Sequence, residues 1–448
     1  MSQFDLVIRA RRAIVNREEV ACSVGVSDGR IAEIAPLSAS MTGRRIIDLG
    51  PDEVLMPGIV DCHVHLCDPG NTEWEGFAHA TRAAAAGGIT ALVDMPLDSS
   101  PTTCDLRSLE LKRQTAEGQC YVDMGFWAGV VPHNLGNLRS LHEAGILGFK
   151  CYVCETGLDE FPGISFEQLE EAMRELAPLD QVLMVHAESA DAIAKIPDIP
   201  DTRSYAEYLS YRPRGVENLA VAQVVEAARL TGGRAHILHL STADVLPMLA
   251  SAQREGVKVS AETCPHYLTI AAEQIPDGAT AFKVGPPIRE ADNREALWRG
   301  IESGLLDMVI SDHSPCTLQM KNFDSGNFAT AWGGLSSLQV SLPVMWTEAR
   351  KRGYQLTHIS RWMSEKTAEF AGLSHKGRIA VGRDADFCIF APDESFVVDK
   401  HQLHHRHPIT AYHGFTLNGV VRRTFLRGQC IDLQAPPRGK LLSKSSRH

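Results

Sequence analysis

The chain has 448 residues, of which 44% are hydrophobic, and a formal net charge of −11. It carries neither a basic stripe nor an arginine-rich tail, which argues against nucleic acid as a partner, and no apolar run approaches the ~20 residues of a membrane span. The composition therefore indicates a globular protein with a large core and a small-molecule partner, with no nucleic acid and no membrane partner.

The beginning of the chain and its cysteines indicate a cytoplasmic protein. The first residues, "MSQFDLVIRARRAIV", lack the apolar region and cleavage site of a signal peptide. The eleven cysteines are odd in number and scattered, as expected for reduced thiols that serve as small core residues. Cys151 and Cys154 form a single CxxC, which we expect to be structural because no second pair accompanies it.

Short alternating strands and turns occupy both ends of the chain. Residues 4–15 and 18–36 form one set, and residues 377–392 and 420–432 form the other, with turn residues at Asp28-Gly29. Neither set has enough strands for a core of its own, so we expect them to combine into one small β-sandwich. The predicted boundaries are 1–55 and 378–448, and the polar end of the chain, residues 439–448, is expected to fray.

Between these ends, residues 56–377 alternate apolar strand-like runs with amphipathic helical stretches such as 215–231. Continuous apolar strands separated by helices are typical of a parallel sheet that is buried on both faces. Eight such units over about 250 residues match an α/β fold of the (β/α)₈ TIM-like barrel type, with an open doubly wound sheet as the alternative. The eight runs are residues 58–66, 88–95, 123–130, 145–153, 181–188, 234–241, 257–264 and 305–313.

Polar residues appear where these apolar runs end. In "GIVDCHVHL" the alternation of a strand places His63 and His65 on the same side, together with Asp61. Four further runs carry an ionisable residue near their carboxyl end, and these residues are Lys150, His186, His239 and Asp312. Because active sites of such barrels lie at the carboxyl ends of the strands, we expect these side chains to meet in the barrel mouth.

Four imidazoles and one carboxylate form a ligand set for zinc, manganese, cobalt or iron, and two divalent ions are plausible. Lys150 does not fit such a site as an ammonium, because the metal ions would repel it. Either burial and the nearby cations lower its pKa so that it acts as a neutral base, or it has been converted into an anionic ligand. The residues themselves leave both alternatives open.

This ordered set of residues resembles that of the cyclic amidohydrolases. The resemblance implies that Lys150 is carbamylated (N6-carboxylysine) and bridges two metal ions, most often zinc. It further implies that His63, His65 and Asp312 hold one ion and that His186 and His239 hold the other. Asp312 would be the catalytic residue that moves a proton from the attacking water to the leaving ring nitrogen.

Three positions distinguish branches of this family. Dihydroorotases have an arginine and an asparagine where this chain has Cys67 and Leu97, and hydantoinases have a tyrosine where it has Glu155. Without that arginine clamp we expect the cavity to offer no fixed cation for a substrate carboxylate. Dihydroorotate is therefore disfavoured, and a neutral ring is expected.

Allantoinases are the branch that the sequence resembles most, and the likeness extends over nearly the whole chain. The shared motifs are "WEG" at residue 74, "GGIT" at 87, "GFKC" at 148, "CPHY" at 264, "PPIR" at 286, "SDHSPC" at 311 and "AWGG" at 331, and "DMPL" at 94 stands where allantoinases have "EMPL". The resemblance implies hydrolysis of allantoin to allantoate in a homotetramer, with backbone groups near Gly285 and Gly333 holding the substrate.

Two other functions remain as alternatives. One is a cyclic amidohydrolase of the hydantoinase, dihydropyrimidinase or dihydroorotase type. The other is a non-catalytic scaffold on the same fold, which the retention of all six expected site positions disfavours. The stretch 315–334, after the last strand, has the length and glycine content of a lid or cavity wall.

Overall fold

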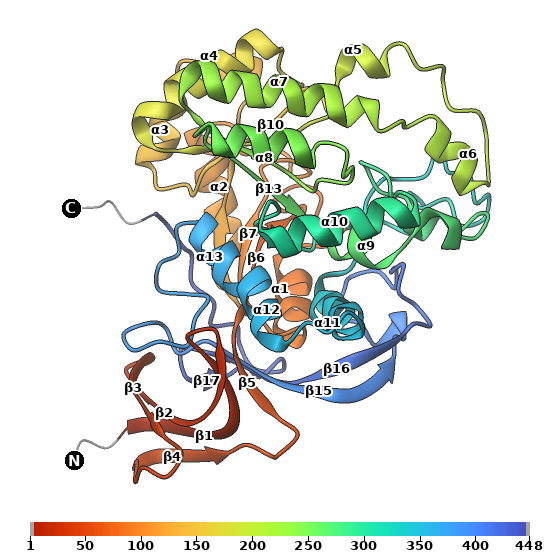
Figure 1. The fold of residues 1–448 in the computed structure, drawn as a ribbon. Coiled ribbons are helices and arrows are strands. Elements are labelled where there is room, and N and C mark those ends of the chain that lie inside the picture. Colours follow the sequence, from red (N-terminus) through yellow and green to blue (C-terminus); the bar gives the residue numbers. More distant parts are fainter. Residues whose placement is uncertain (1–3, 445–448) are drawn as a thin grey trace.

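The structure, a computed structural model, describes residues 4–444, and Figure 1 shows the course of the chain. A parallel barrel forms its centre. The barrel strands are β6 (Ile59–Val64), β7 (Ile89–Asp94), β8 (Asp123–Phe126), β9 (Ala128–Gly129), β10 (Phe149–Tyr152), β11 (Val182–His186), β12 (Arg234–Ile237), β13 (Val259–Thr263) and β14 (Met308–Val309). Each lies in one of the eight predicted runs, and this confirms the predicted α/β barrel.

The barrel strands pair in chain order. Three strands, β6 to β8, form one parallel sheet, and the six from β9 to β14 form another. The two sheets are continuous along the chain because β8 and β9 belong to one predicted run, which is interrupted only at Trp127. On the other side a parallel bridge joins Val64 to His313, and the amide of His65 donates to the carbonyl of His313 at 2.8 Å. The strands therefore close into a ring.

Helices surround the barrel, and α7, α8 and α10 lie outside its strands in Figure 1. Ser165 begins α4 with a capping box, and the buried residues of that helix recur at helical spacing. No helix within residues 4–444 has the length and apolar character needed to cross a membrane. The helices are α1 (Phe77–Ala86), α2 (Leu106–Ala116), α3 (Leu138–Glu143), α4 (Phe166–Leu176), α5 (Ala190–Ile193), α6 (Tyr205–Ser210), α7 (Gly215–Thr231), α8 (Leu246–Arg254), α9 (Pro265–Thr269), α10 (Ala291–Ser303), α11 (Ser341–Lys351), α12 (Leu356–Ser360) and α13 (Lys366–Phe370).

Both chain ends build a second, mixed sheet beside the barrel, as predicted. Its order is β17-β16-β15-β5-β1-β2-β3, with β4 paired to β1. The long strand β1 and its neighbours enclose a separate apolar core that includes Ile8, Val24, Phe387 and Phe425. The strands are β1 (Phe4–Val15), β2 (Glu18–Ser27), β3 (Arg30–Pro36), β4 (Gly43–Asp48), β5 (Val54–Pro57), β15 (Phe387–Val397), β16 (Thr416–Leu426) and β17 (Gln429–Cys430).

The end of the chain differs from expectation. We predicted a frayed tail from residue 439, but the part that the structure describes runs along β8. The amide of Met124 donates to the carbonyl of Lys440 at 2.9 Å, and the amide of Leu442 donates to that of Met124 at 2.7 Å. These ladder hydrogen bonds order the backbone despite its polar composition. Residues 445–448 lie outside the described residues.

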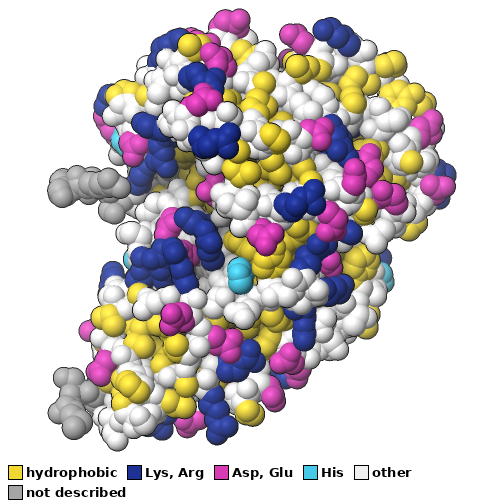
Figure 2. Space-filling model, in the orientation of Figure 1, with side chains coloured by type: hydrophobic (Ala, Val, Ile, Leu, Met, Phe, Trp, Pro, Cys, Tyr) yellow, Lys and Arg dark blue, Asp and Glu magenta, His cyan; other side chains and the backbone are white. Residues whose placement is uncertain are grey.

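The distribution of surface charge and the state of the cysteines agree with what the composition indicates. Positive and negative side chains are interspersed over the face seen in Figure 2. All eleven cysteines are free thiols, and only Cys430 is exposed. Cys151 and Cys154 are both buried, as expected for a structural CxxC.

A buried lysine joins the barrel to the second sheet. The ammonium of Lys376 lies 2.7 Å from Asp123 at the start of β8, and 3.2 Å and 2.6 Å from Asp384 and Asp386 next to β15. Arg427 of the second sheet also contacts Asp123, at 2.6 Å. The neighbouring carboxylates raise the pKa of Lys376 against the opposing effect of burial, so the lysine stays charged.

We predict that Lys376→Met destabilises the protein by about 3–5 kcal/mol, because it leaves buried carboxylates without their cation. The measurement is the urea unfolding midpoint. Lys366→Met is the control, because this lysine forms only a partly exposed ion pair with Glu369 and its loss should cost less than about 1 kcal/mol. Equal effects of the two changes would contradict the role given to Lys376.

Candidate active site

The six residues predicted to form the site all lie at the carboxyl end of the barrel. His63, Lys150 and His186 belong to β6, β10 and β11, whereas His65, His239 and Asp312 follow the ends of their strands. All six are buried. The structure therefore brings together residues that are up to 249 positions apart in the sequence, from His63 to Asp312.

The side chains form two neighbouring groups. In the first, the Nε2 atoms of His63 and His65 lie 3.3 Å and 3.7 Å from the same carboxylate oxygen of Asp312. In the second, Nδ1 of His186 lies 3.0 Å from Nε2 of His239. The ring centres of His63 and His239 are 5.3 Å apart, so the groups are adjacent.

The backbone turns sharply at two of these residues. His239 has a φ of 34° and Asp312 a φ of 47°, which lie in the left-handed region that non-glycine residues rarely adopt. Such conformations persist where the surroundings hold them, and they occur often at functional sites. At the second position Asp61 accepts a hydrogen bond from the amide of Ser311 at 3.1 Å. Asp61 thus ties β6 to the turn at Asp312. It also accepts from the backbone amide of His63 at 3.2 Å, but it is not among the side chains that could hold an ion together with His63.

Burial determines the charges of the cluster. It lowers the pKa of His63, His65, His186 and His239, so that all four imidazoles are neutral at neutral pH, the form in which histidine binds metals. Burial also raises the pKa of Asp312. It lowers the pKa of Lys150 to about 8, against the opposing effect of the carboxylates of Asp312, Asp98 and Glu262.

Several buried polar atoms in this cluster lack a hydrogen-bond partner among the described residues. They are Nζ of Lys150, Nε2 of His63 and Nδ1 of His239. Unpaired polar atoms in a protein core are costly and call for a bound group. The donors are nitrogen and carboxylate oxygen, which suit zinc and related divalent ions. His63, His65 and Asp312 lie close enough together to hold one ion.

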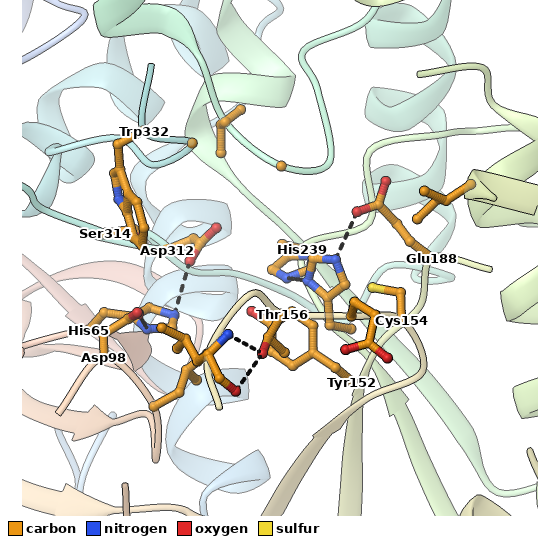
Figure 3. Close-up of a pocket in the computed structure, with 18 of the residues that line it drawn as sticks. His65, Asp98, Tyr152, Cys154, Thr156, Glu188, His239, Asp312, Ser314 and Trp332 are labelled. Atoms are coloured by element: carbon orange, nitrogen blue, oxygen red, sulfur yellow. Dashed lines mark hydrogen bonds and ion pairs between the residues drawn. The ribbon is translucent and has the colours of Figure 1, made fainter. Parts of the chain in front are cut away.

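A cavity of about 440 Å³ opens above the cluster. In Figure 3, His65 and Asp312 lie on one side of this cavity and His239 and Glu188 on the other. His63 and Lys150 are not among the residues that line it, so they lie behind its wall. Its other lining residues include Leu97, Asp98, Tyr152, Cys154, Glu155, Arg212, Gly285, Trp332 and Gly333.

The two predicted glycines lie together on this cavity. A Cβ added at Gly333 would stand 3.8 Å from the amide nitrogen of Gly285. The stretch 315–334 forms part of the wall, as predicted. Buried Lys321 fixes it by donating to the carbonyls of Trp332 at 2.8 Å and Gly334 at 2.5 Å.

We expected no fixed cation for a substrate carboxylate, but the cavity does contain a cation, which is paired with a carboxylate of the protein. Arg212 lines it, and its guanidinium lies 3.7 Å from the carboxylate of Glu188. Of the three positions that distinguish the branches, Leu97 and Glu155 reach the cavity wall and Cys67 does not. The argument from Cys67 missed Arg212 because this arginine follows α6, far in sequence from any strand end.

Sequence analysis also missed two carboxylates that line the cavity beside the imidazoles. Asp98 lies 2.7 Å from Nδ1 of His65, and Glu188 lies 2.9 Å from Nε2 of His186. Glu188 could have been found, since it follows His186 by two residues in a run that otherwise reads as apolar. Asp98 lies in a loop, where an acidic residue is unremarkable.

Comparison with known proteins places this chain in a family. The model of the amidohydrolase family matches residues 54–431. The chain belongs to the amidohydrolase family. It is 49% identical to an allantoinase of Streptomyces avermitilis, over 99% of this chain and all of that protein. It is 42% identical to an allantoinase of Arabidopsis thaliana, over 95% of this chain and 87% of that one.

A solved structure of similar fold is an L-hydantoinase (dihydropyrimidinase) from Arthrobacter aurescens. It superposes with a TM-score of 0.90 at 30% identity, over 98% of both chains. The chain is accordingly an amidohydrolase, a hydrolase of cyclic amides, built on the barrel and second sheet described above.

We predict that Lys150→Met makes the metal-free protein more stable at pH 7. The folded pKa of about 8 lies below the ordinary 10.5, so below pH 8 the folded state must hold a buried charge. Between pH 8 and pH 10.5 Lys150 is protonated in the unfolded chain and largely neutral in the folded one. The free energy of unfolding of the wild type therefore rises with pH over this range, and its difference from that of Lys150→Met becomes smaller.

The measurement is urea unfolding of both proteins, free of metal, at pH 7 and pH 10. Lys376→Met serves as the matched control, because its ammonium is paired and the same substitution should destabilise the protein. A Lys150→Met variant less stable than the wild type at pH 7 would contradict the account.

Proposed function

We propose that this protein is an allantoinase, which hydrolyses the cyclic amide of allantoin to give allantoate in purine degradation. The observation that carries the proposal is its 49% and 42% identity to allantoinases along nearly the whole chain. The cavity beside the six clustered residues supports it, since a small ring needs such a concave site.

The residues of the cluster would hold two divalent metal ions, with zinc as the first choice and manganese, cobalt or iron as others. His63, His65 and Asp312 would hold one, and His186 and His239 would hold the other. Lys150, as N6-carboxylysine, would be a ligand of both. When bound, the two metals supply a hydroxide nucleophile at neutral pH and polarise the carbonyl that is attacked.

The lowered pKa of Lys150 supports its carbamylation, because only the neutral amine reacts with carbon dioxide. A lysine with a pKa of about 8 is neutral in roughly one molecule in ten at pH 7. Once the ammonium has lost one proton to water, the Nζ lone pair forms the bond to the carbon of carbon dioxide, one carbon–oxygen π bond of which opens to give the carboxylate, and a second proton leaves to water. A buried cation thereby becomes an anion, which removes the repulsion between Lys150 and the metals.

Asp312 would carry the proton in the ring-opening step. It accepts a proton from the attacking water as the carbon–oxygen bond forms, and delivers it to the ring nitrogen as the carbon–nitrogen bond breaks. A carboxyl group with a raised pKa suits this exchange, since it can both accept and return a proton near neutral pH.

Gly285 and Gly333 would hold the substrate by their backbone. Among residues 4–444, neither amide N–H has an acceptor, and both glycines line the cavity. Leu97 supplies an apolar surface. Arg212 is already beside Glu188, so it can donate to a neutral ureido oxygen without being a free cation for a substrate carboxylate.

The similarity to an L-hydantoinase supports a second candidate, a cyclic amidohydrolase that acts on hydantoins or dihydropyrimidines. A dihydroorotase-type activity and a scaffold without activity are less favoured, the latter because all six site residues are present. We further propose a cytoplasmic location and a homotetramer, which rest on the resemblance to allantoinases.

We predict that the metal-reconstituted enzyme hydrolyses allantoin with a higher kcat/KM than hydantoin, dihydrouracil or dihydroorotate. Asp312→Asn should lower kcat for allantoin by ~10²-fold or more and change KM less, because it removes the proton carrier. Exposed Asp48→Asn on β4 is the control and should leave both constants unchanged.

Steady-state kinetics on the four substrates test both statements. Faster turnover of dihydroorotate or hydantoin than of allantoin would overturn the substrate assignment. An Asp312→Asn enzyme of wild-type kcat would overturn the role given to that aspartate.

A further inference from the structure

A third carboxylate, Glu262, lies behind the site and takes no part in the mechanism above. It belongs to β13, is fully buried and does not line the cavity. A buried carboxylate is costly unless it is paired or hydrogen-bonded. Within residues 4–444 no lysine or arginine forms an ion pair with Glu262; the side chains that its carboxylate approaches are the imidazoles of His63 and His236.

The strongest of these contacts fixes the ring of His63. Oε1 of Glu262 lies 2.5 Å from Nδ1 of His63, whereas Nε2 of that ring faces Asp312 at 3.3 Å. A carboxylate that accepts from Nδ1–H leaves the lone pair of the neutral ring on Nε2. This is the nitrogen that points into the centre of the site, where a metal would bind it.

The same carboxylate oxygen also contacts the second group of ligands. Oε1 accepts from the backbone amide of His239 at 3.3 Å, the residue whose φ of 34° requires support from its surroundings. On the far side, Oε2 lies 3.2 Å from Nε2 of His236 without a hydrogen bond between them, and Nδ1 of His236 is hydrogen-bonded to Ser260 at 2.7 Å. Through Oε1, Glu262 thus touches one residue from each group.

We propose that Glu262 is a positioning residue that sets the tautomer and ring orientation of His63 and the backbone turn at His239, and so increases the affinity of the site for divalent metal. The inference rests on the proposed function, since it concerns the same metal centre. Glu262 does not line the cavity, so it cannot contact the substrate, and its role concerns only the metal site.

The test compares metal binding by wild type, Glu262→Gln and Glu262→Asp. An amide in place of the carboxylate can present an N–H to His63 and no longer selects the tautomer, and the shorter aspartate retracts the oxygens from the ring. We expect both variants to bind Zn²⁺ about 10–100-fold more weakly in competition with a chromophoric chelator. The visible absorption of Co²⁺-loaded protein should change as well, because it reports the ligand arrangement directly.

Asp123→Asn is the matched control. It removes a buried carboxylate at the start of β8, at the end of the barrel away from the site, where Lys376 and Arg427 pair with it. The change should therefore lower the thermal stability and leave the Zn²⁺ affinity and the Co²⁺ spectrum unchanged. If Glu262→Gln does not fold, Glu262→Asp, which keeps the charge, provides the comparison.

Three results would contradict the inference, and only the last of them is also a failure of the proposed function. Wild-type affinity and an unchanged Co²⁺ spectrum in the Glu262 variants would overturn this inference alone, as would equal loss of affinity in Asp123→Asn. Wild-type protein that takes up no metal would overturn the proposed function and the inference together.

Discussion

The amine of Lys150 has no hydrogen-bond partner in the described structure, yet it lies buried among four neutral imidazoles and several carboxylates. Burying a charged amine without a hydrogen-bond partner destabilises the folded state, and this burial is what lowers the pKa of Lys150. The arrangement becomes favourable only if something else enters the site. In this account, metal ions take the unpaired nitrogens and the lysine becomes the anion that joins them.

The barrel makes this arrangement possible. Parallel strands that close into a ring bring their carboxyl ends to one rim, so single residues from strands far apart in sequence share one small volume. The ion pairs around Lys376 hold the second sheet against the opposite part of the barrel, away from the site. The binding chemistry and the contact with the second sheet thus lie at opposite ends of the barrel.

The sequence predicted the parts of the site that depend on local geometry. Alternation along β6 places His63 and His65 on one side, and both do reach Asp312. The apolar runs likewise located every barrel strand. However, the last run, 305–313, contains only the short strand β14, because the chain leaves the strand before the left-handed turn at Asp312.

What the sequence could not predict depends on contacts across the barrel. Glu262 reads as one acid in a strand, and its contact with His63 joins residues 199 positions apart. Arg212 follows a helix rather than a strand, so no periodicity marks it as a cavity residue. The tail at residues 439–444 is short and has few apolar residues, and its backbone is ordered by hydrogen bonds with β8 that composition does not reveal.

The central claim is that Lys150 is a carbamylated bridge between two metals. The most direct measurement is the ¹³C NMR spectrum of protein reconstituted with Zn²⁺ in ¹³C-labelled bicarbonate, with Lys150→Ala as the reference. The account predicts a carbamate resonance in the wild type that is absent from Lys150→Ala and is lost when the metal is removed. A fully metal-loaded, active wild-type enzyme without that resonance would contradict it.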